Sequence, residues 1–223
     1  MLFSSIPFLF YFLPAALGLY FLAPRRMKNA VLLLCSLVFY GWGEPKYLIL
    51  MLVSVAQGYG FGLLIEKCRK HAKLFLSLSI AVSLLLLGYF KYADFFLSSF
   101  HAVTGISVPA LQIALPIGIS FYTFQILSYV VDVYRRDTPA QRNFIDLAAY
   151  ISMFPQLIAG PIVRYTDVAA QLKNRTHTLF GAAAGVRRFI LGLAKKILLA
   201  NVLGQLVQEF QAAQSPDVLY HWL

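Results

Sequence analysis

The stretch that decides the fold reads Phe154-Pro155-Gln156-Leu157-Ile158-Ala159-Gly160-Pro161-Ile162-Val163-Arg164-Tyr165. It is apolar enough to enter a bilayer, but Pro155 and the pair Gly160-Pro161 would break a helix that ran through it. Irregular backbone at membrane depth is tolerated only where protein or a water-filled cavity satisfies its polar groups. The stretch therefore predicts a wall of an intramembrane cavity, and polar groups in such cavities usually carry function.

Composition places the whole chain in a membrane. Of its 223 residues, 60% are hydrophobic and 13% are charged, against about 25% charged residues in soluble domains. The formal net charge is +10, but the basic residues fall in short clusters between apolar runs. Cytoplasmic loops of membrane proteins have this pattern, whereas a nucleic-acid-binding domain shows a continuous basic surface. We therefore expect an integral membrane protein with no nucleic-acid partner.

Apolar windows predict an all-α, polytopic transmembrane helical bundle that forms a single membrane domain over residues 1–223. Neither an internal repeat nor a low-complexity linker divides the sequence. The predicted spans cover residues 2–22, 30–40, 47–65, 74–100 and 113–133, followed by a broken segment at 144–163 and a helical stretch at 179–210.

The first span lacks the basic start of a secretory signal. Its basic residues follow the apolar run instead of preceding it, so we expect a retained span with the N-terminus outside. The loops at 23–29, 66–73 and 134–143 then lie inside, and they hold most of the basic residues that separate the first spans. This arrangement predicts a multi-pass membrane protein with its N-terminus outside.

The same charge rule bears on the segment at 144–163. If it entered and returned, Arg164, Lys173 and Arg175 would stay inside, so the rule favours a re-entrant segment over a kinked but complete span. The stretch at 179–210 has two open interpretations. Its basic residues share half of a helical wheel, which fits a helix lying on anionic lipid, but two half-spans with a break fit equally.

Several polar residues in apolar surroundings are candidates for a site. Ser120 and Gln156 suit hydrogen bonds between helices or contacts to a substrate. Arg164 suits an interfacial anchor or a group that holds an anion, since the arginine fork matches phosphate. Asp132 has the spacing for a local ion pair with Arg136, unless it faces the interior and lines a path. The candidate cavity residues are therefore Gln156, Gly160, Pro161, Arg164 and Ser120.

The residue types that most often carry catalysis show no catalytic arrangement in this sequence. The four histidines occur in polar or terminal stretches typical of solvated loops, at His71, His101, His177 and His221. Cys35 and Cys68 have no partners at metal-ligand spacing. Lys91 and Asp94 suit a local ion pair. We therefore assign no catalytic residue, no metal site and no bound cofactor.

Five stretches together carry a family resemblance: Phe39–Tyr47, Gly88–Tyr92, Leu115–Gln125, Phe154–Tyr165 and Gly185–Lys196. In content and order they resemble the membrane-bound O-acyltransferase (MBOAT) family, in particular its bacterial alginate O-acetyltransferase branch. The resemblance covers about residues 1–205. It implies a helical fold around a tunnel through the bilayer, with the segment at Phe154–Tyr165 beside it and donor-side contacts from the candidate cavity residues.

The resemblance also implies a reaction. An acetyl or acyl thioester would donate its acyl group to a hydroxyl of a cell-surface polysaccharide such as alginate. The expected partners are membrane lipid, the polysaccharide acceptor and periplasmic acetyltransferase proteins. A histidine suits such a reaction because it can take a hydroxyl proton near neutral pH.

The chain departs from the family at that histidine. The family's histidine lies in the second half of such enzymes, and none of the four histidines here matches its setting. We therefore expect an incomplete MBOAT-type fold, an N-terminal portion whose catalytic histidine lies beyond residue 223, and no activity from this chain alone. A C-terminal half encoded separately is a further candidate partner.

Two other interpretations stay open beside the enzyme. The first is a non-enzymatic scaffold or channel subunit of a polysaccharide modification or export complex, which would keep the cavity without the histidine. The second is a small transporter, which the absence of paired intramembrane charges and of inverted repeats in the sequence disfavours.

Overall fold

The computed structural model describes residues 3–105, 111, 113–157 and 160–212, and every regular element in these residues is helical. Among these described residues, three helices are long and apolar enough to cross a membrane: Pro45–Lys67, Arg69–Thr104 and Leu179–Phe210. The all-α membrane fold predicted from composition is therefore confirmed. The chain divides into two compact units, one formed by Phe10–Arg175 and the other by the residues up to Leu9 together with those from Thr176 onward.

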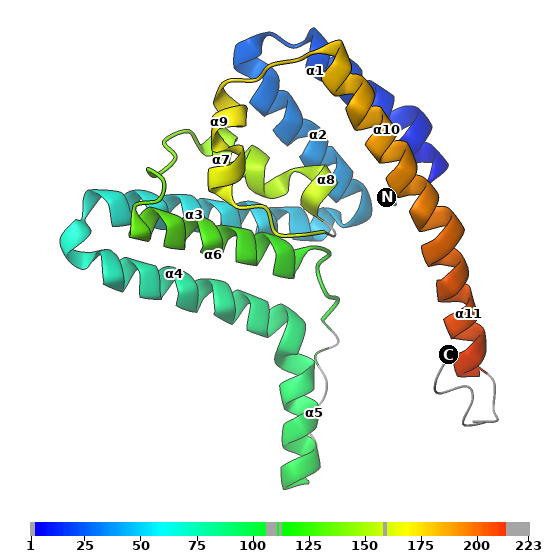
Figure 1. Cartoon of the computed structure of the whole chain (residues 1–223). Helices are drawn as coiled ribbons and strands as arrows, with labels where there is room; N and C mark the ends of the chain where they lie inside the picture. The colour runs from blue at the N-terminus through cyan, green and yellow to red at the C-terminus, as the bar shows by residue number, and fades with distance from the viewer. Residues whose placement is uncertain (1–2, 106–110, 112, 158–159, 213–223) are drawn as a thin grey trace. The chain divides into compact units, whose positions relative to one another are not determined.

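The first unit carries most of the helices in the described residues (Figure 1). They are α1 (Leu13–Leu22), α2 (Lys28–Gly43), α3 (Leu48–Lys67), α4 (Ala72–Leu87), α5 (Ala93–Thr104), α6 (Ile119–Arg135), α7 (Phe144–Ser152), α8 (Phe154–Leu157) and α9 (Tyr165–Lys173). A π-helical turn at Gly88–Tyr92 joins α4 to α5, so that the two form one continuous helix.

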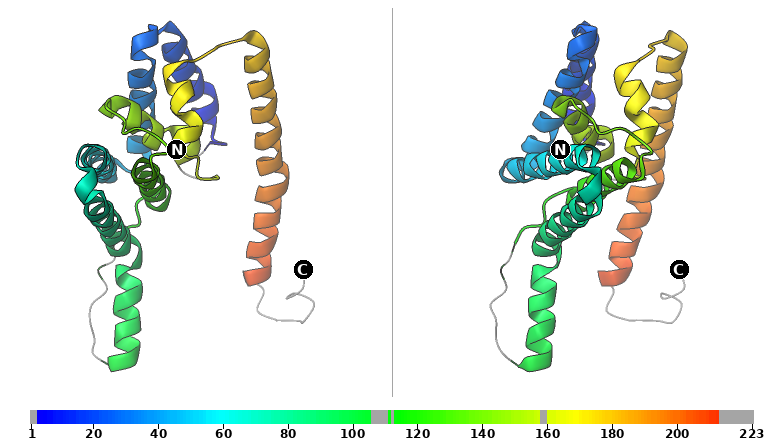
Figure 2. Two further views of the ribbon diagram at one scale, coloured as in Figure 1. Left: turned by 60° about the vertical axis from the view of Figure 1, so that its left-hand side comes forward. Right: turned by 90° about the vertical axis from the view of Figure 1, so that its left-hand side faces the viewer.

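Helix α6 packs against both α3 and α4, which also pack against each other, and the three run side by side in Figures 1 and 2. The close approach of α3 to α6 depends on small residues. A Cβ atom at Gly58 would lie 2.6 Å from Cγ2 of Ile126, and one at Gly62 would lie 2.9 Å from the Tyr129 hydroxyl. Small residues that bring backbones together are a common basis of helix association in membranes, where the hydrophobic effect drives little.

The predicted interruption of the chain between 144 and 163 is present. Helix α7 ends at Ser152, and α8 is a single turn with Pro155 near its start. Gly160 then has a φ of 127°, a conformation that an L side chain rarely adopts. After Pro161 the chain has no regular structure until Tyr165 begins α9. Residues 158–159 lie outside the described part, and re-entry of this segment into a bilayer stays a prediction.

The bounds of α6 and α2 differ from the predicted spans. Helix α6 begins at Ile119, several residues after the predicted start of the span at 113, because Pro116 and Gly118 precede it. Gly118 has a φ of 77°, and a Cβ there would lie 2.7 Å from the carbonyl oxygen of Leu157. The start of α6 therefore lies directly against the broken segment. Helix α2 is longer than the predicted 30–40 and extends from Lys28 to Gly43.

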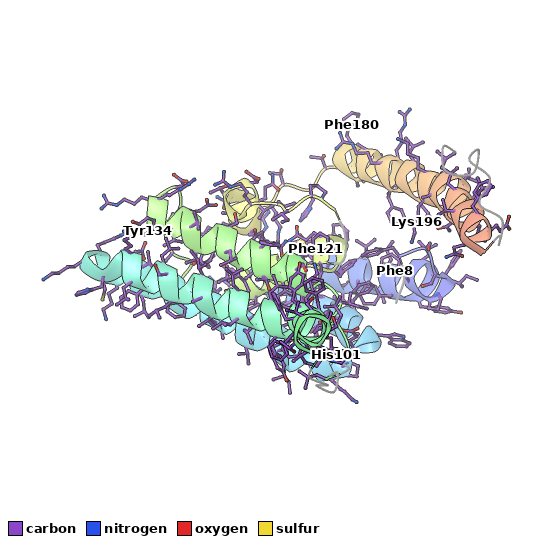
Figure 3. All side chains as sticks on the ribbon, turned by 90° about the horizontal axis from the view of Figure 1, so that it is seen from below. Phe8, His101, Phe121, Tyr134, Phe180 and Lys196 are labelled. Carbon is purple, nitrogen blue, oxygen red and sulfur yellow. The ribbon has the colours of Figure 1, made fainter. Side chains whose placement is uncertain are left out.

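The second unit contains one long helix. Thr178 caps α10 (Leu179–Lys195) by accepting a hydrogen bond from the Gly181 N–H at 3.0 Å, and a π-helical turn at Lys196–Ala200 continues into α11 (Asn201–Ala212). Lys196, labelled in Figure 3, lies near the middle of this helix and donates to Ser4 Oγ at 3.0 Å. The helix is continuous over the described residues. Its placement, on the surface of a bilayer or across it, stays a prediction.

The packing of α3 on α6 makes a direct prediction. Gly58→Ala should destabilise the protein by about 1–3 kcal/mol, because the new methyl group would overlap Ile126, whose β-branched side chain is stiff in a helix. Gly60→Ala on the same helix meets nothing within 4 Å and should be neutral or stabilising by up to about 1 kcal/mol through helix propensity. Thermal unfolding in detergent, followed by circular dichroism, compares the two. Equal midpoints for both variants would contradict the close α3–α6 contact.

Candidate functional site

One face of α6 carries a row of buried polar side chains. Tyr122, Gln125, Tyr129 and Asp132 follow one another at steps of three, four and three residues, and each is at most 2% exposed. Residues at these steps lie on the same face of a helix, so the row extends over about 15 Å at 1.5 Å per residue. We call these four residues the α6 row. Such a row on a membrane helix faces protein or a polar cavity, because polar groups are costly against lipid.

An ion pair connects the end of the α6 row to the broken segment. The guanidinium of Arg164 donates to Oδ1 of Asp132, whose side chain is 1% exposed, whereas that of Arg164 is 50% exposed. This hydrogen bond, and then the charge of Asp132, raise the pKa of Arg164 above its ordinary value. The Asp132 carboxylate is thus compensated, and Arg164 keeps one side toward solvent.

The local pair of Asp132 with Arg136 predicted from sequence spacing is wrong. Helix α6 ends at Arg135, and Arg136 takes a left-handed backbone conformation with a φ of 70°. The helical spacing that would bring the two side chains together therefore stops one residue too early. The alternative, in which Asp132 faces the interior, is the one that the structure supports.

A network of tyrosines surrounds the ion pair. The Gln141 N–H donates to the Tyr129 hydroxyl at 2.9 Å, and the Gln141 side chain donates to the Tyr165 hydroxyl at 2.8 Å. The Tyr165 ring packs edge-on against the rings of Tyr129 and Tyr150, with centroids 5.2 Å and 5.3 Å apart. These contacts join α6, the loop before α7, α7 itself and the start of α9. Sequence reasoning missed the network, although the three-four-three spacing on α6 was visible.

The predicted site residues occupy two different places. Gln156 donates to the carbonyl oxygen of Tyr150 at 2.6 Å, and the Tyr150 hydroxyl donates to the carbonyl oxygen of Val163. Gln156 and Arg164 therefore belong to one tightly bonded segment, on which Gly160 and Pro161 are exposed. Ser120 bonds to a different element and lies at the start of α6, the end of that helix that packs against Leu157.

Ser120 instead accepts a hydrogen bond from Lys91 Nζ at 3.4 Å. Asp94 accepts one from the Leu111 N–H at 2.7 Å. Each member of the predicted Lys91–Asp94 pair thus has a partner on a different segment. These bonds connect the α4–α5 helix to the chain around the start of α6.

The α6 row also contains unused hydrogen-bonding capacity. Among the described residues, four buried side-chain atoms have no hydrogen-bond partner: Tyr40 Oη, Tyr122 Oη, Gln125 Oε1 and Asp132 Oδ2. Three of the four belong to the row. A buried polar group left without a partner costs about 1–3 kcal/mol, so a ligand, water or further protein that satisfied these atoms would gain that energy. This property marks the row as the best candidate for a binding path.

The histidines lie on other elements. His71 ends the short helix Arg69–His71, His101 lies on α5 (Figure 3) and His177 precedes α10, whereas His221 lies outside the described residues. Within the part of the chain that the structure describes, no group of three or more histidine, cysteine, aspartate or glutamate side chains could hold a metal ion.

The sequence of the region that holds this site matches one family. The model of the MBOAT family, the membrane-bound O-acyltransferases, matches residues 70–213, a range that contains the whole α6 row and Arg164. The chain belongs to this family. Its resemblance to the family, stated above from five stretches of sequence, is thereby confirmed.

Relatives in this family have been named for their reactions. The chain is 44% identical over 230 residues to the probable alginate O-acetylase AlgI of Pseudomonas syringae pv. tomato, and equally identical to that of Azotobacter vinelandii. It is 31% identical over 258 residues to a peptidoglycan O-acetyltransferase of Helicobacter pylori. These alignments use all of this chain but 44%, 46% and 49% of the relatives, so the chain spans about half their length. No solved structure matches the chain.

The Asp132–Arg164 pair makes an asymmetric prediction for this MBOAT chain. Arg164→Gln should lower the thermal midpoint more than Asp132→Asn, because the first leaves a buried carboxylate unpaired and the second leaves a half-exposed guanidinium that water can solvate. The double variant should be more stable than Arg164→Gln alone. Midpoints of thermal unfolding in detergent test this order. The reverse order for the single variants would show that the two groups are not paired.

Proposed function

We propose that this chain forms the N-terminal portion of a membrane O-acetyltransferase that acts on a cell-surface polysaccharide, with alginate as the first candidate. Membership of the MBOAT family and the names of the relatives support this proposal. The single observation that carries it is the location of the α6 row and Arg164 inside the range that matches the family.

Arg164 is the proposed contact to the acyl donor. Asp132 holds one side of the guanidinium, and the half-exposed remainder keeps N–H donors for an anion. Arginine is always charged and presents its donors in a rigid fork that suits phosphate. An acyl thioester donor that carries a phosphate or another anionic group would fit this position. The broken segment with Gln156, Gly160 and Pro161 would then form the wall beside the donor.

The proton acceptor for the sugar hydroxyl is proposed to come from the region that corresponds to the rest of the relatives' length. The histidines of the described residues belong to elements other than α6 and other than the segment that holds Arg164. The chain alone is therefore proposed to be inactive. We propose that the complete enzyme lies in the inner membrane with its N-terminus outside and that periplasmic acetyltransferase proteins are its partners.

One observation favours a second candidate function. The α6 row offers buried hydrogen-bonding atoms without a histidine beside them on the same helix. A scaffold or channel subunit of a polysaccharide modification or export complex needs such a polar path and no base. Two measurements distinguish the candidates. The enzyme would transfer acetyl groups, whereas the scaffold would support assembly of the complex without acetyl transfer.

A chimera tests the proposed reaction. This chain would be joined to the part of the Pseudomonas syringae relative that follows its matched region, and expressed in an alginate-producing strain without its own acetylase. Acetyl content of the secreted polysaccharide is measured by proton NMR. We expect acetylation from the chimera and none from the chain alone. A stable, membrane-inserted chimera that restores complex assembly without acetylation would support the scaffold instead.

The same chimera tests the role of Arg164. Arg164→Gln should lower acetylation by about 10- to 100-fold at limiting donor, as expected for one lost hydrogen bond to a charged group. Arg142→Gln is the matched control, because its side chain is 85% exposed and pairs only at 3.7 Å with Glu66. Equal activities of the two variants, at equal amounts of protein in the membrane, would contradict the donor contact.

A further inference from the structure

Two cations meet at one aromatic ring in the first unit. Nζ of Lys28 lies 4.7 Å from the centroid of the Tyr20 ring, and the guanidinium carbon of Arg175 lies 5.6 Å from the same centroid. Tyr20 belongs to α1, Lys28 begins α2, and Arg175 follows α9. Residues far apart in the sequence therefore bring two positive charges to one place. An aromatic face attracts each cation but leaves their mutual repulsion in place.

Hydrogen bonds fix this arrangement. Arg175 donates to Oδ1 of Asn29, and the Asn29 amide donates in turn to Oδ1 of Asp146 at 2.7 Å and to the carbonyl oxygen of Leu172 at 3.2 Å. Asn29 thus joins the start of α2 to α7 and to the end of α9. Arg175 is therefore held beside the Tyr20 ring by hydrogen bonds, and Lys28 lies beside the same ring at the start of α2.

The surroundings of the ring carry excess positive charge. Arg25 and Arg26 form the short helix Arg25–Met27 that leads into α2, and Lys173 ends α9 two residues before Arg175. Lys28 also lies 5.6 Å from the centroid of Phe21. We call Tyr20, Lys28, Asn29 and Arg175, with these three neighbouring basic residues, the α1–α2 corner.

Exposed apolar side chains adjoin the basic ones. Near the end of α1, Phe21 is 57% exposed and Leu22 is 85% exposed, and Met27 beyond the turn is 55% exposed. In a membrane protein, a basic cluster directly beside exposed apolar side chains is the arrangement found at the level of the lipid headgroups, where the apolar groups meet acyl chains and the cations meet phosphate. A soluble anion would use the cations alone and leave the apolar side chains without a partner.

We propose that the α1–α2 corner is a binding site for an anionic phospholipid. The lipid phosphate would lie between Lys28 and Arg175 and relieve their repulsion, and its acyl chains would lie along Phe21, Leu22 and Met27. Arg175 contributes the N–H donors that Asn29 does not use, and Tyr20 keeps both cations in position. This site is separate from the α6 row and does not depend on the proposed acetyl transfer.

Lipid retention by the purified chain tests the site. The protein is exchanged into detergent with phosphatidylglycerol or phosphatidylcholine, and bound lipid is counted by native mass spectrometry across a lipid titration. Phosphatidylglycerol should bind more tightly than phosphatidylcholine. The Lys28→Gln/Arg175→Gln variant should lose about 25-fold in phosphatidylglycerol affinity, at about fivefold for each basic group.

The control variant makes the same charge change elsewhere. Lys67→Gln/Lys70→Gln removes two basic groups from the turn between α3 and α4 and should keep full affinity. Lys28→Gln alone leaves the Asn29 hydrogen bonds intact and should lose about fivefold in phosphatidylglycerol affinity. This single variant keeps the test valid if the double variant fails to fold.

Three results would overturn the proposal. The first is an equal loss of phosphatidylglycerol in the control variant, which would show general charge attraction. The second is equal binding of phosphatidylglycerol and phosphatidylcholine by the unchanged protein. The third is full displacement of the lipid by millimolar glycerol phosphate, which would show a site for a soluble phosphate instead of a lipid.

Discussion

The ion pair between Asp132 and Arg164 is the interaction on which the arrangement of the candidate site depends. A carboxylate that is 1% exposed is tolerated in a fold only where a cation or hydrogen bonds replace its lost hydration. Here the cation is supplied by a residue 32 positions away, at the end of the segment that two prolines and a glycine keep out of a regular helix. The pair therefore ties an irregular backbone segment to helix α6, which itself packs against both α3 and α4.

The tyrosine network adds hydrogen bonds and ring contacts between the elements that the ion pair joins. Gln141 bonds both Tyr129 and Tyr165, so the loop before α7 is connected to α6 and to α9 at the same place. The Tyr150 side chain and Gln156 then bond the backbone within the broken segment itself. Backbone that lacks regular hydrogen bonds can lie inside a membrane protein only where such partners satisfy it. In the described part of the broken segment, the carbonyl oxygens of Tyr150 and Val163 have such partners.

Sequence reasoning found the parts of this arrangement that depend on composition and on local breakers. The apolar runs gave the helices, and Pro155, Gly160 and Pro161 marked the place where regular helix ends. It failed where the partner is remote. The spacing of Asp132 and Arg136 suggested a local pair, but a helix end at Arg135 removes that geometry, and no pattern along the chain indicates that Arg164 takes its place. Gln141 was missed for the same reason, because both of its tyrosine partners are identified only by the tertiary fold.

The α6 row was only partly predictable from the sequence, and it bears most directly on function. The spacing of the row can be read from the sequence. The same spacing would occur, however, if all four side chains were fully hydrogen-bonded to neighbouring helices. Tyr129 is bonded in this way, through Gln141, whereas Tyr122, Gln125 and Asp132 each keep an unused atom at almost complete burial. Natural proteins leave few buried polar atoms without a partner, and those that persist are commonly explained by water, ligand or a functional role. Three such atoms lie on one face of one helix, inside the range that matches the MBOAT family, so the hydrogen bonds that the described fold leaves incomplete are concentrated on α6.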